Sequence, residues 1–288
     1  MEASRFEAPT DVAAAVALLQ AEEGARVLSG GTDLLVQMRT GRGAPPLFVD
    51  VKRIPRLMAM TLDSSGLTLG ASVPAAEIFE NESIKQLWPG LAEATDLIGS
   101  TQVQGRATLS GNLCNASPGA DTVPALIACR ARVVIAGPQG EREVAVEDFT
   151  TGPGQTVLDR GELVVEFKIP APAPHASDAY LRLIPRTEMD IAVVGAGVSV
   201  ELDADGVVRD ARVALGAVAP KAIVVEAAAE ALVGSRLEDA ALEAAGAASS
   251  AAANPIADKR GTIAYRKTVS GVLTRRAARI AYDRARNR

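Results

Sequence analysis

A run of small and hydroxyl-bearing residues from Arg106 to Asp121 constrains this chain more than any other stretch, and it reads RATLSGNLCNASPGAD. Gly111 carries no Cβ, so the main chain can approach a ligand closely there. Hydroxyl and amide side chains around it supply short donors and acceptors. Because an apolar, helix-like segment begins at Thr122, the run predicts a loop that presents backbone N–H groups to an anion.

A second glycine loop occupies Leu28 to Leu34 and reads LSGGTDL. It follows a short apolar strand and precedes apolar residues at helical spacing, an order that aims a helix N-terminus at a phosphate. A lone glycine loop is most often a polar surface loop, but two such loops together predict a clamp around one extended diphosphate. Thr32, Asp33 and Asp121 also suit helix caps, and capping is compatible with binding.

Charge and apolar patterning limit the partners and the compartment. The chain has 288 residues and a net charge of −5, so it lacks the basic field that a nucleic acid or an anionic membrane would require. Its apolar runs all stay short of the roughly 20 residues that span a bilayer. The N-terminus lacks a basic segment followed by an apolar core, and we therefore expect a cytoplasmic protein.

Metal-ligating residues are scarce. The sequence contains two cysteines, Cys114 and Cys129, and one histidine, His175. Two thiols cannot supply the four ligands of an iron–sulfur cluster or a cysteine-rich zinc site. His175 stands in a proline-rich stretch, which is typical of a solvated linker. We therefore expect neither a metal site nor a histidine-based catalytic group in this chain.

The remaining pattern is that of an α+β protein. The hydrophobic spacing after the first loops predicts helices at 74–80 and 87–99 and strands at 132–136 and 162–169. Beyond a Pro-Ala run, it predicts a three-stranded antiparallel meander and then helices at 222–233, 237–250 and 262–286. Within the meander, Val194–Gly197 is similar to part of a dinucleotide fingerprint. It lacks the third glycine and continues as a strand, which favours close packing in a sheet.

The two loops together are similar to motifs of a known family. Ser29-Gly-Gly-Thr-Asp33 and Thr108-Leu-Ser-Gly-Asn112, followed by Asp121, resemble the FAD-binding subunits of the molybdenum hydroxylases, including those of the xanthine dehydrogenase and aerobic carbon monoxide dehydrogenase types. A segment ending in Met189-Asp190-Ile-Ala also resembles the signature that opens the C-terminal domain of that family. The similarity extends over essentially the whole chain.

The resemblance implies a fold and a domain plan. The expected fold is α+β, with a two-subdomain FAD-binding fold of the PCMH/vanillyl-alcohol-oxidase type and a C-terminal domain that has a three-stranded antiparallel sheet and helices. The expected limits are 1–56 and 57–172 for the two FAD-binding subdomains and 178–288 for the C-terminal domain.

The resemblance also implies the residues that bind FAD. The two loops would meet the diphosphate and the sugar groups beside it, an amide and a carboxylate would hydrogen-bond the cofactor, an apolar side chain would contact the flavin or the adenine, and an arginine would stand where relatives often carry lysine near the isoalloxazine. The amide and the carboxylate are Asn115 and Asp121, the apolar side chain is Val164, and the arginine is Arg182. The residues of the two loops are Val27, Leu28, Ser29, Gly30, Gly31, Thr32, Asp33, Leu34, Ala107, Thr108, Leu109, Ser110, Gly111 and Asn112.

The sequence departs from the family pattern in two places. Ser110 replaces a glycine that many relatives carry, so a hydroxymethyl group must be accommodated in the second loop. Thr32-Asp33 stands where the carbon monoxide enzymes typically have His-Ser, which weakens the case for that substrate. Asp190 belongs to the family signature, and it serves either cofactor contact or a turn between domains.

The function that the resemblance implies is electron transfer within an oxidoreductase complex. A large partner subunit would oxidise the substrate at a molybdopterin cofactor. Two [2Fe–2S] clusters of a small partner subunit would carry the electrons to FAD in this chain. The final acceptor would be NAD, oxygen, a quinone or another carrier, and the complex would form a dimer of heterotrimers.

Two other functions are compatible with the same residues. The first is a self-contained FAD-dependent reductase resembling UDP-N-acetylenolpyruvoylglucosamine reductase, which would need a proton donor beside the flavin. The second is a cofactor-free scaffold that kept the fold, although the glycines of both loops argue for a retained ligand.

Overall fold

A small parallel sheet forms the N-terminal layer of the computed structural model, which describes residues 4–288, with the backbone alone at Arg42. The strands lie in the order β1–β3–β2, and both pairings are parallel. The layer consists of β1 (Arg5–Glu7), α1 (Val12–Ala21), β2 (Arg26–Leu28), α2 (Leu34–Gln37), the π-helical turn η1 (Met38–Arg42) and β3 (Leu47–Asp50). Only β3 is mostly buried, whereas β1 and β2 are largely exposed. This layer is therefore thin.

A five-stranded antiparallel sheet forms the middle layer, in the order β4–β5–β10–β6–β7. Its strands are β4 (Met60–Asp63), β5 (Gly66–Gly70), β6 (Arg132–Gly137), β7 (Gly140–Ala145) and β10 (Leu163–Pro170), with a separate hairpin of β8 (Thr150–Gly152) and β9 (Gln155–Thr156). The accompanying helices are α3 (Pro55–Met58), α4 (Ala75–Phe79), α5 (Glu82–Leu87), α6 (Pro89–Asp96), α7 (Thr101–Gln104), α8 (Leu109–Cys114), α9 (Thr122–Ala128) and α10 (Val146–Phe149).

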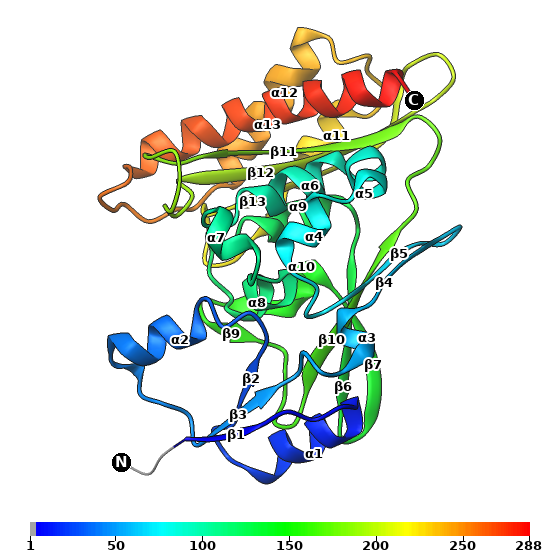
Figure 1. Ribbon diagram of the computed structural model, residues 1–288. Coiled ribbons are helices and arrows are strands. Elements are labelled where there is room, and N and C mark those ends of the chain that lie inside the picture. Colours follow the sequence, from blue (N-terminus) through cyan, green and yellow to red (C-terminus); the bar gives the residue numbers. More distant parts are fainter. Residues whose placement is uncertain (1–3) are drawn as a thin grey trace.

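The C-terminal layer is an antiparallel sheet with the order β11–β12–β13–β14, covered by helices (Figure 1). Its elements are β11 (Ala176–Leu183), β12 (Val194–Leu202), β13 (Val208–Gly216), β14 (Ile223–Val224), α11 (Glu226–Leu232), α12 (Asp239–Ala252) and α13 (Ile263–Arg286). Helix α13 packs on β11 and β12, whereas α9 and α6 of the middle layer pack on the same sheet. The sheet therefore has a short fourth strand in addition to the three that the sequence predicts.

Two predicted helices differ from the observed ones. The segment predicted as a helix at 222–233 begins with β14, because the β-branched residues Ile223 and Val224 favour an extended chain. The helix predicted at 87–99 spans the junction of α5 and α6 at Pro89, whose missing N–H and ring prevent a helix from continuing through it. The expected domain limits at residues 56 and 178 fall inside α3 and β11.

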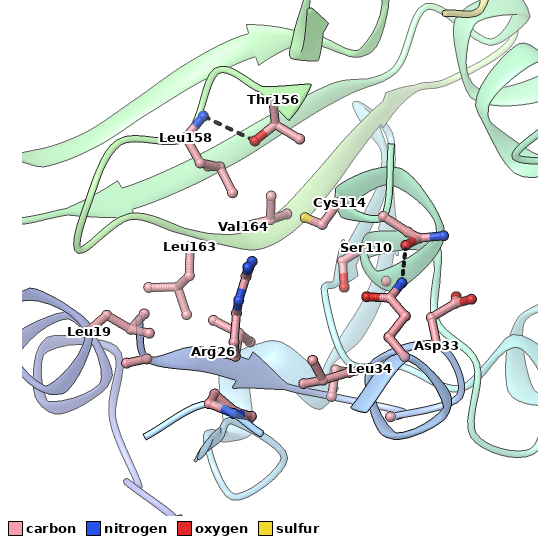
Figure 2. A pocket seen from close by; sticks show the side chains of 18 of the residues that line it. Leu19, Arg26, Asp33, Leu34, Ser110, Cys114, Thr156, Leu158, Leu163 and Val164 are labelled. Atoms are coloured by element: carbon pink, nitrogen blue, oxygen red, sulfur yellow. Dashed lines mark hydrogen bonds between the residues drawn. The ribbon is translucent and has the colours of Figure 1, made fainter. Parts of the chain in front are cut away.

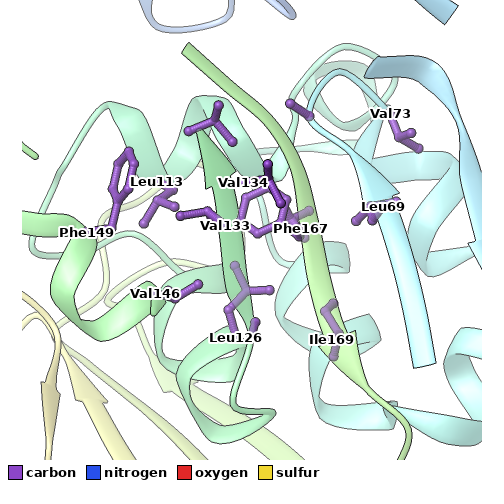
Figure 3. Close-up of a cluster of buried hydrophobic side chains, with 14 of the residues drawn as sticks. Leu69, Val73, Leu113, Leu126, Val133, Val134, Val146, Phe149, Phe167 and Ile169 are labelled. Atoms are coloured by element: carbon purple, nitrogen blue, oxygen red, sulfur yellow. The ribbon is translucent and has the colours of Figure 1, made fainter. Parts of the chain in front are cut away.

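The main hydrophobic core joins the first two layers. Phe167 of β10 and Val133 of β6 point toward Leu113 of α8 and Phe149 of α10 (Figure 3). All four are at most 1% exposed. The same cluster includes Ala15 and Leu19 of α1, so the N-terminal layer is held to the middle sheet by apolar packing. Among the residues described, none forms a helix long and apolar enough to cross a bilayer.

Small residues let the C-terminal sheet approach the middle layer. Gly197 of β12 lies against α9, and a Cβ built on it would stand 2.5 Å from the carbonyl oxygen of Pro124. Gly216 on β13 faces the Pro124 ring in the same way. The interpretation of Val194–Gly197 as a closely packed strand is confirmed, because these residues open β12.

A buried carboxylate lies at the same junction. Asp178 of β11 accepts hydrogen bonds from the Leu91 N–H at 3.0 Å and from the Cys129 thiol at 3.2 Å. Its Oδ1 is buried and has no partner among residues 4–288. Burial raises the pKa of Asp178 to about 6, and its hydrogen bonds only partly oppose that shift.

We expect Gly197→Ala to lower the free energy of unfolding by about 1–3 kcal/mol, because overpacking against a backbone carbonyl forces the two layers apart. Thermal unfolding monitored by circular dichroism measures this. Gly105→Ala is the matched control, since a Cβ there meets nothing within 4 Å in the described chain. Equal midpoints for the two variants would contradict the packing argument.

We expect Asp178→Asn to flatten the pH dependence of stability. Because the pKa of Asp178 is raised from 3.8 to about 6 on folding, the folded state binds a proton more tightly, and stability falls as pH rises between these values. Above pH 6, ionisation of Asp178 lowers the free energy of unfolding of the wild type by about 3 kcal/mol, at 1.36 kcal/mol per pKa unit. Urea unfolding at pH 5 and pH 7 measures it. If the free energy of unfolding changes with pH equally in the variant and the wild type, Asp178 is not the source of that pH dependence.

Candidate cofactor-binding site

A cleft of about 880 Å³ separates the N-terminal layer from the middle layer. Strand β2 and the loop before α2 form one wall, and α8 with the segment from β9 to β10 forms the other (Figure 2). Its volume lies in the range of small-molecule and cofactor sites, which is roughly 300–1,000 Å³. Both glycine loops predicted from the sequence line this cleft.

The first loop presents backbone donors to the cleft. The N–H groups of Gly30, Gly31 and Thr32 make no hydrogen bond within residues 4–288. Gly31 has φ +77°, a conformation that side chains rarely adopt. Asp33 precedes α2 but makes no capping bond in the described chain, and burial raises the pKa of its carboxyl. The loop therefore offers free donors at a helix N-terminus, a favourable arrangement for an anion.

The second loop is the start of α8. Thr108 caps the helix by accepting a hydrogen bond from the Gly111 N–H at 3.0 Å. The Ser110 hydroxyl donates to the carbonyl of Ala71, so the hydroxymethyl group that departs from the family pattern is directed into the protein. Gly111 is exposed toward the cleft. A Cβ there would meet, among the described residues, only the Thr108 hydroxyl, at 3.1 Å.

The two loops touch each other. A Cβ built on Gly30 would lie 1.9 Å from the carbonyl oxygen of Arg106, which is shorter than any real contact. Gly30 is therefore required by the approach of one loop to the other, whether or not a ligand is bound. The sequence alone suggested only an approach of this glycine to a ligand.

Two side-chain contacts complete the wall formed by α8. Asn115 accepts a hydrogen bond of 2.9 Å from Gln37 of α2, and this bond crosses from one layer to the other (Figure 2). Asn112 accepts hydrogen bonds from the hydroxyl and the N–H of Thr122, at 2.7 and 3.3 Å, and so ties α8 to α9. Both asparagines line the cleft.

Four of the predicted residues lie outside the cleft lining. Leu28 and Leu109 do not line the cleft, although the residues on either side of each do. Asp121 and Arg182 form a buried ion pair of 2.7 Å, and the Tyr180 hydroxyl donates to the same carboxylate at 3.1 Å. Burial raises the pKa of Asp121 to about 6, although Arg182 and Tyr180 act to lower it. Val164, by contrast, lines the cleft.

The family follows from comparison with known proteins. The family described as "FAD binding domain in molybdopterin dehydrogenase" matches residues 2–172, and "CO dehydrogenase flavoprotein C-terminal domain" matches residues 179–281. The carbon monoxide dehydrogenase medium chain of Hydrogenophaga pseudoflava is 34% identical over 97% of this chain and 98% of its own length. This chain belongs to the FAD-binding subunits of the molybdenum hydroxylases.

Other members of this family are also similar to the chain in sequence and in structure. The xanthine dehydrogenase FAD-binding subunit of Escherichia coli O157:H7 is 31% identical over 74% of this chain and 73% of its own length. A solved structure of carbon monoxide dehydrogenase from H. pseudoflava matches with a TM-score of 0.93 and 34% identity, over 98% of each chain. Quinoline 2-oxidoreductase from Pseudomonas putida 86 matches with a TM-score of 0.90 and 26% identity, over 98% of each chain. The expected α+β architecture of this flavoprotein subunit is therefore confirmed.

The residues of the cleft suit FAD chemically. The free N–H groups of Gly30, Gly31 and Thr32 and the first turn of α8 form a set of neutral donors on two loops, which is how proteins commonly hold a diphosphate. In the described part of the chain no cluster of three or more His, Cys, Asp or Glu residues is placed to hold a metal. The donor set therefore fits a flavin dinucleotide held by backbone contacts.

Sequence reasoning missed the far rim of the cleft. The additional lining residues come from α1 and the turn after it, from β2, α2 and η1, from the turn before β3, from the segment before α7, from α8 and from the stretch after β8 up to the first residue of β10: Leu19, Glu22, Glu23, Gly24, Ala25, Arg26, Gln37, Met38, Gly43, Ala44, Pro45, Ile98, Cys114, Gly154, Thr156, Leu158, Asp159, Arg160, Gly161, Glu162 and Leu163. Arg26 points into the cleft (Figure 2). These residues have no common spacing or composition, so no sequence signal marks them.

We expect the two loop glycines to separate binding from folding. Gly111→Val places a side chain in the cleft with little effect on folding, so FAD should bind at least roughly tenfold more weakly, a loss of about 1.4 kcal/mol. Gly30→Val overlaps a backbone carbonyl, so it should lower both the thermal midpoint of the flavin-free protein and FAD affinity. Flavin titration and thermal unfolding measure these effects.

The control is Gly105→Val, because the space around a Cβ at Gly105 is open within the described chain. It should retain both FAD affinity and the thermal midpoint. If Gly111→Val binds FAD as tightly as Gly105→Val does, the placement of the cofactor against α8 is wrong.

Proposed function

We propose that this chain holds FAD in the cleft and passes electrons from [2Fe–2S] clusters of a small partner subunit to an external acceptor. The observation that carries the proposal is the pair of loops that present backbone donors to one cleft, in a chain of the molybdenum hydroxylase family. When bound, the flavin supplies the ability to exchange electrons with one-electron and two-electron partners.

The chain's own residues bind and position the cofactor. The loops Ser29–Asp33 and Thr108–Asn112 hold the diphosphate, and the contact between Gly30 and Arg106 fixes their separation. The Gln37–Asn115 hydrogen bond limits how far α2 can move from α8. The buried Asp121–Arg182 pair places two charges between the middle and C-terminal layers, where they contribute to the potential felt by a nearby flavin.

Substrate oxidation belongs to a large partner subunit that carries the molybdopterin cofactor. The names of the similar proteins refer to carbon monoxide, xanthine and quinoline, which range from a diatomic gas to fused bicyclic heterocycles. A similar flavin-binding chain in all three complexes supports a substrate site outside this chain. A dimer of heterotrimers and a cytoplasmic location remain predictions from the sequence.

The proposal requires that electrons reach this chain from another polypeptide. We expect the isolated, FAD-loaded chain to leave organic substrates unchanged. Its flavin should be reduced when the small iron–sulfur subunit and the large molybdopterin subunit from the same organism are restored with their substrate. Bleaching of the visible flavin absorbance under anaerobic conditions measures this, and dithionite provides the control for a reducible flavin.

Other outcomes would select the alternatives. Oxidation of NADPH by the isolated chain with UDP-N-acetylenolpyruvoylglucosamine would establish a self-contained reductase. A colourless protein that takes up no FAD would establish a scaffold. An unbleached flavin in the complete complex, with intact clusters and active molybdopterin, would refute electron transfer through this chain.

A further inference from the structure

The ends of two parallel strands support the first glycine loop from behind. In the pairing of β2 with β3, Leu28 lies opposite Asp50, and each is the last residue of its strand. The Val51 N–H donates to the Leu28 carbonyl at 3.2 Å. Because the carboxyl ends of parallel strands meet at one edge of a sheet, side chains that follow β3 can reach the loop that follows β2.

Lys52, two residues after β3, holds the main chain of this loop. Its Nζ donates to the carbonyl oxygen of Ser29 at 2.9 Å, and no other hydrogen bond to that carbonyl is made among residues 4–288. Asp50 orients the lysine, because its Oδ1 accepts from Lys52 Nζ at 2.7 Å and from the Lys52 N–H at 3.0 Å. The side chains of Lys52 and Asp50 are 28% and 16% exposed, so the pair is largely shielded from solvent.

The hydrogen bond from Lys52 fixes the direction of the peptide that joins Ser29 to Gly30. A trans peptide is planar, and its carbonyl and N–H point in opposite directions. Ser29 and Gly30 line the cleft, whereas Lys52 does not, so the lysine holds the carbonyl on the side away from the cleft. The Gly30 N–H is thereby directed toward the cleft, and it makes no hydrogen bond within the described chain.

The local sequence does not fix this direction. Glycine populates positive and negative φ about equally, so a peptide that precedes a glycine can turn over at small steric cost. The contact of Gly30 with Arg106 fixes where the glycine lies, not which way the preceding peptide faces. A peptide turned over would direct the Ser29 carbonyl, an acceptor, at the diphosphate and remove one donor from it. The hydrogen-bond partner of the carbonyl therefore decides between the two directions.

We propose that Lys52 is a positioning residue of the cofactor site, which aims the Gly30 N–H at the diphosphate of FAD by holding the carbonyl of Ser29. The inference rests on the proposed function, in which both glycine loops hold that diphosphate. Lys52 does not line the cleft, and its charge is offset by Asp50. It acts through the main chain, since a hydrogen bond from an ammonium group to a carbonyl is both charge-assisted and directional.

The test compares two lysines that each donate to a backbone carbonyl. Lys52→Met removes the bond to Ser29. The matched control is Lys221→Met, which removes a bond of 3.1 Å to the carbonyl of Glu147, away from the cleft lining. The complex is purified gently from the native organism, stripped of flavin and titrated with FAD. We expect Lys52→Met to bind FAD at least roughly tenfold more weakly than the control, with the thermal midpoints of the flavin-free proteins lowered alike.

Two further measurements separate positioning from a contribution to stability alone. Lys52→Arg should restore most of the FAD affinity, because a guanidinium also donates to a carbonyl and pairs with a carboxylate such as Asp50. A crystal structure of the flavin-free Lys52→Met protein should show the carbonyl of Ser29 turned toward the cleft, with the surrounding fold retained.

The outcomes are distinct from those of the proposed function. The positioning role is overturned if Lys52→Met binds FAD as tightly as Lys221→Met does, if Lys52→Arg binds it no better than Lys52→Met, or if the Ser29 carbonyl keeps its direction. None of these results affects electron transfer, which stands when substrate bleaches the flavin of the wild-type complex. If the wild-type complex takes up FAD and substrate does not bleach it, the proposed function fails, while weakened binding by Lys52→Met still supports the role of Lys52.

Discussion

The contact between two glycine loops governs the arrangement of this protein. Gly30 approaches the carbonyl of Arg106 so closely that no side chain fits between them. Together with the Gln37–Asn115 hydrogen bond and the apolar packing of α1, this contact sets the distance between the N-terminal layer and α8, and therefore the width of the cleft. Because the contact is made by backbone, it is insensitive to side-chain rotamers. The free N–H groups of Gly31 and Thr32 are consequently held at a fixed position relative to the first turn of α8.

The C-terminal layer is positioned by a different kind of contact. Gly197 and Gly216 allow its sheet to rest on Pro124 of α9, and Asp178 and Asp121 are buried at the same boundary. Because α9 begins directly after the run that contains the second glycine loop, one short helix connects the sheet to that loop. The two outer layers are therefore held against the middle layer by different contacts, at Arg106 and at Pro124.

The sequence predicted the two loops because glycine, hydroxyl and capping residues act locally, within a few positions of one another. It also predicted the packing role of Gly197, since a strand pattern continues through it. It could not predict the pairing of Asp121 with Arg182, which are far apart in the chain and meet only when β11 packs on α9. The far rim around Arg26 and Leu163 was missed for the same reason, and the helix expected at 222–233 was wrong where local β-propensity prevails.

The thin N-terminal layer has a consequence for the life of the protein in the cell. With β1 and β2 largely exposed, the layer resists local opening mainly through the buried residues of one strand, β3, and through Ala15 and Leu19 of α1. A ligand that bridges both loops stabilises the closed form by mass action. On the proposed function, chains without the cofactor open more often, so we expect proteases that recognise the unfolded segment to cleave them first.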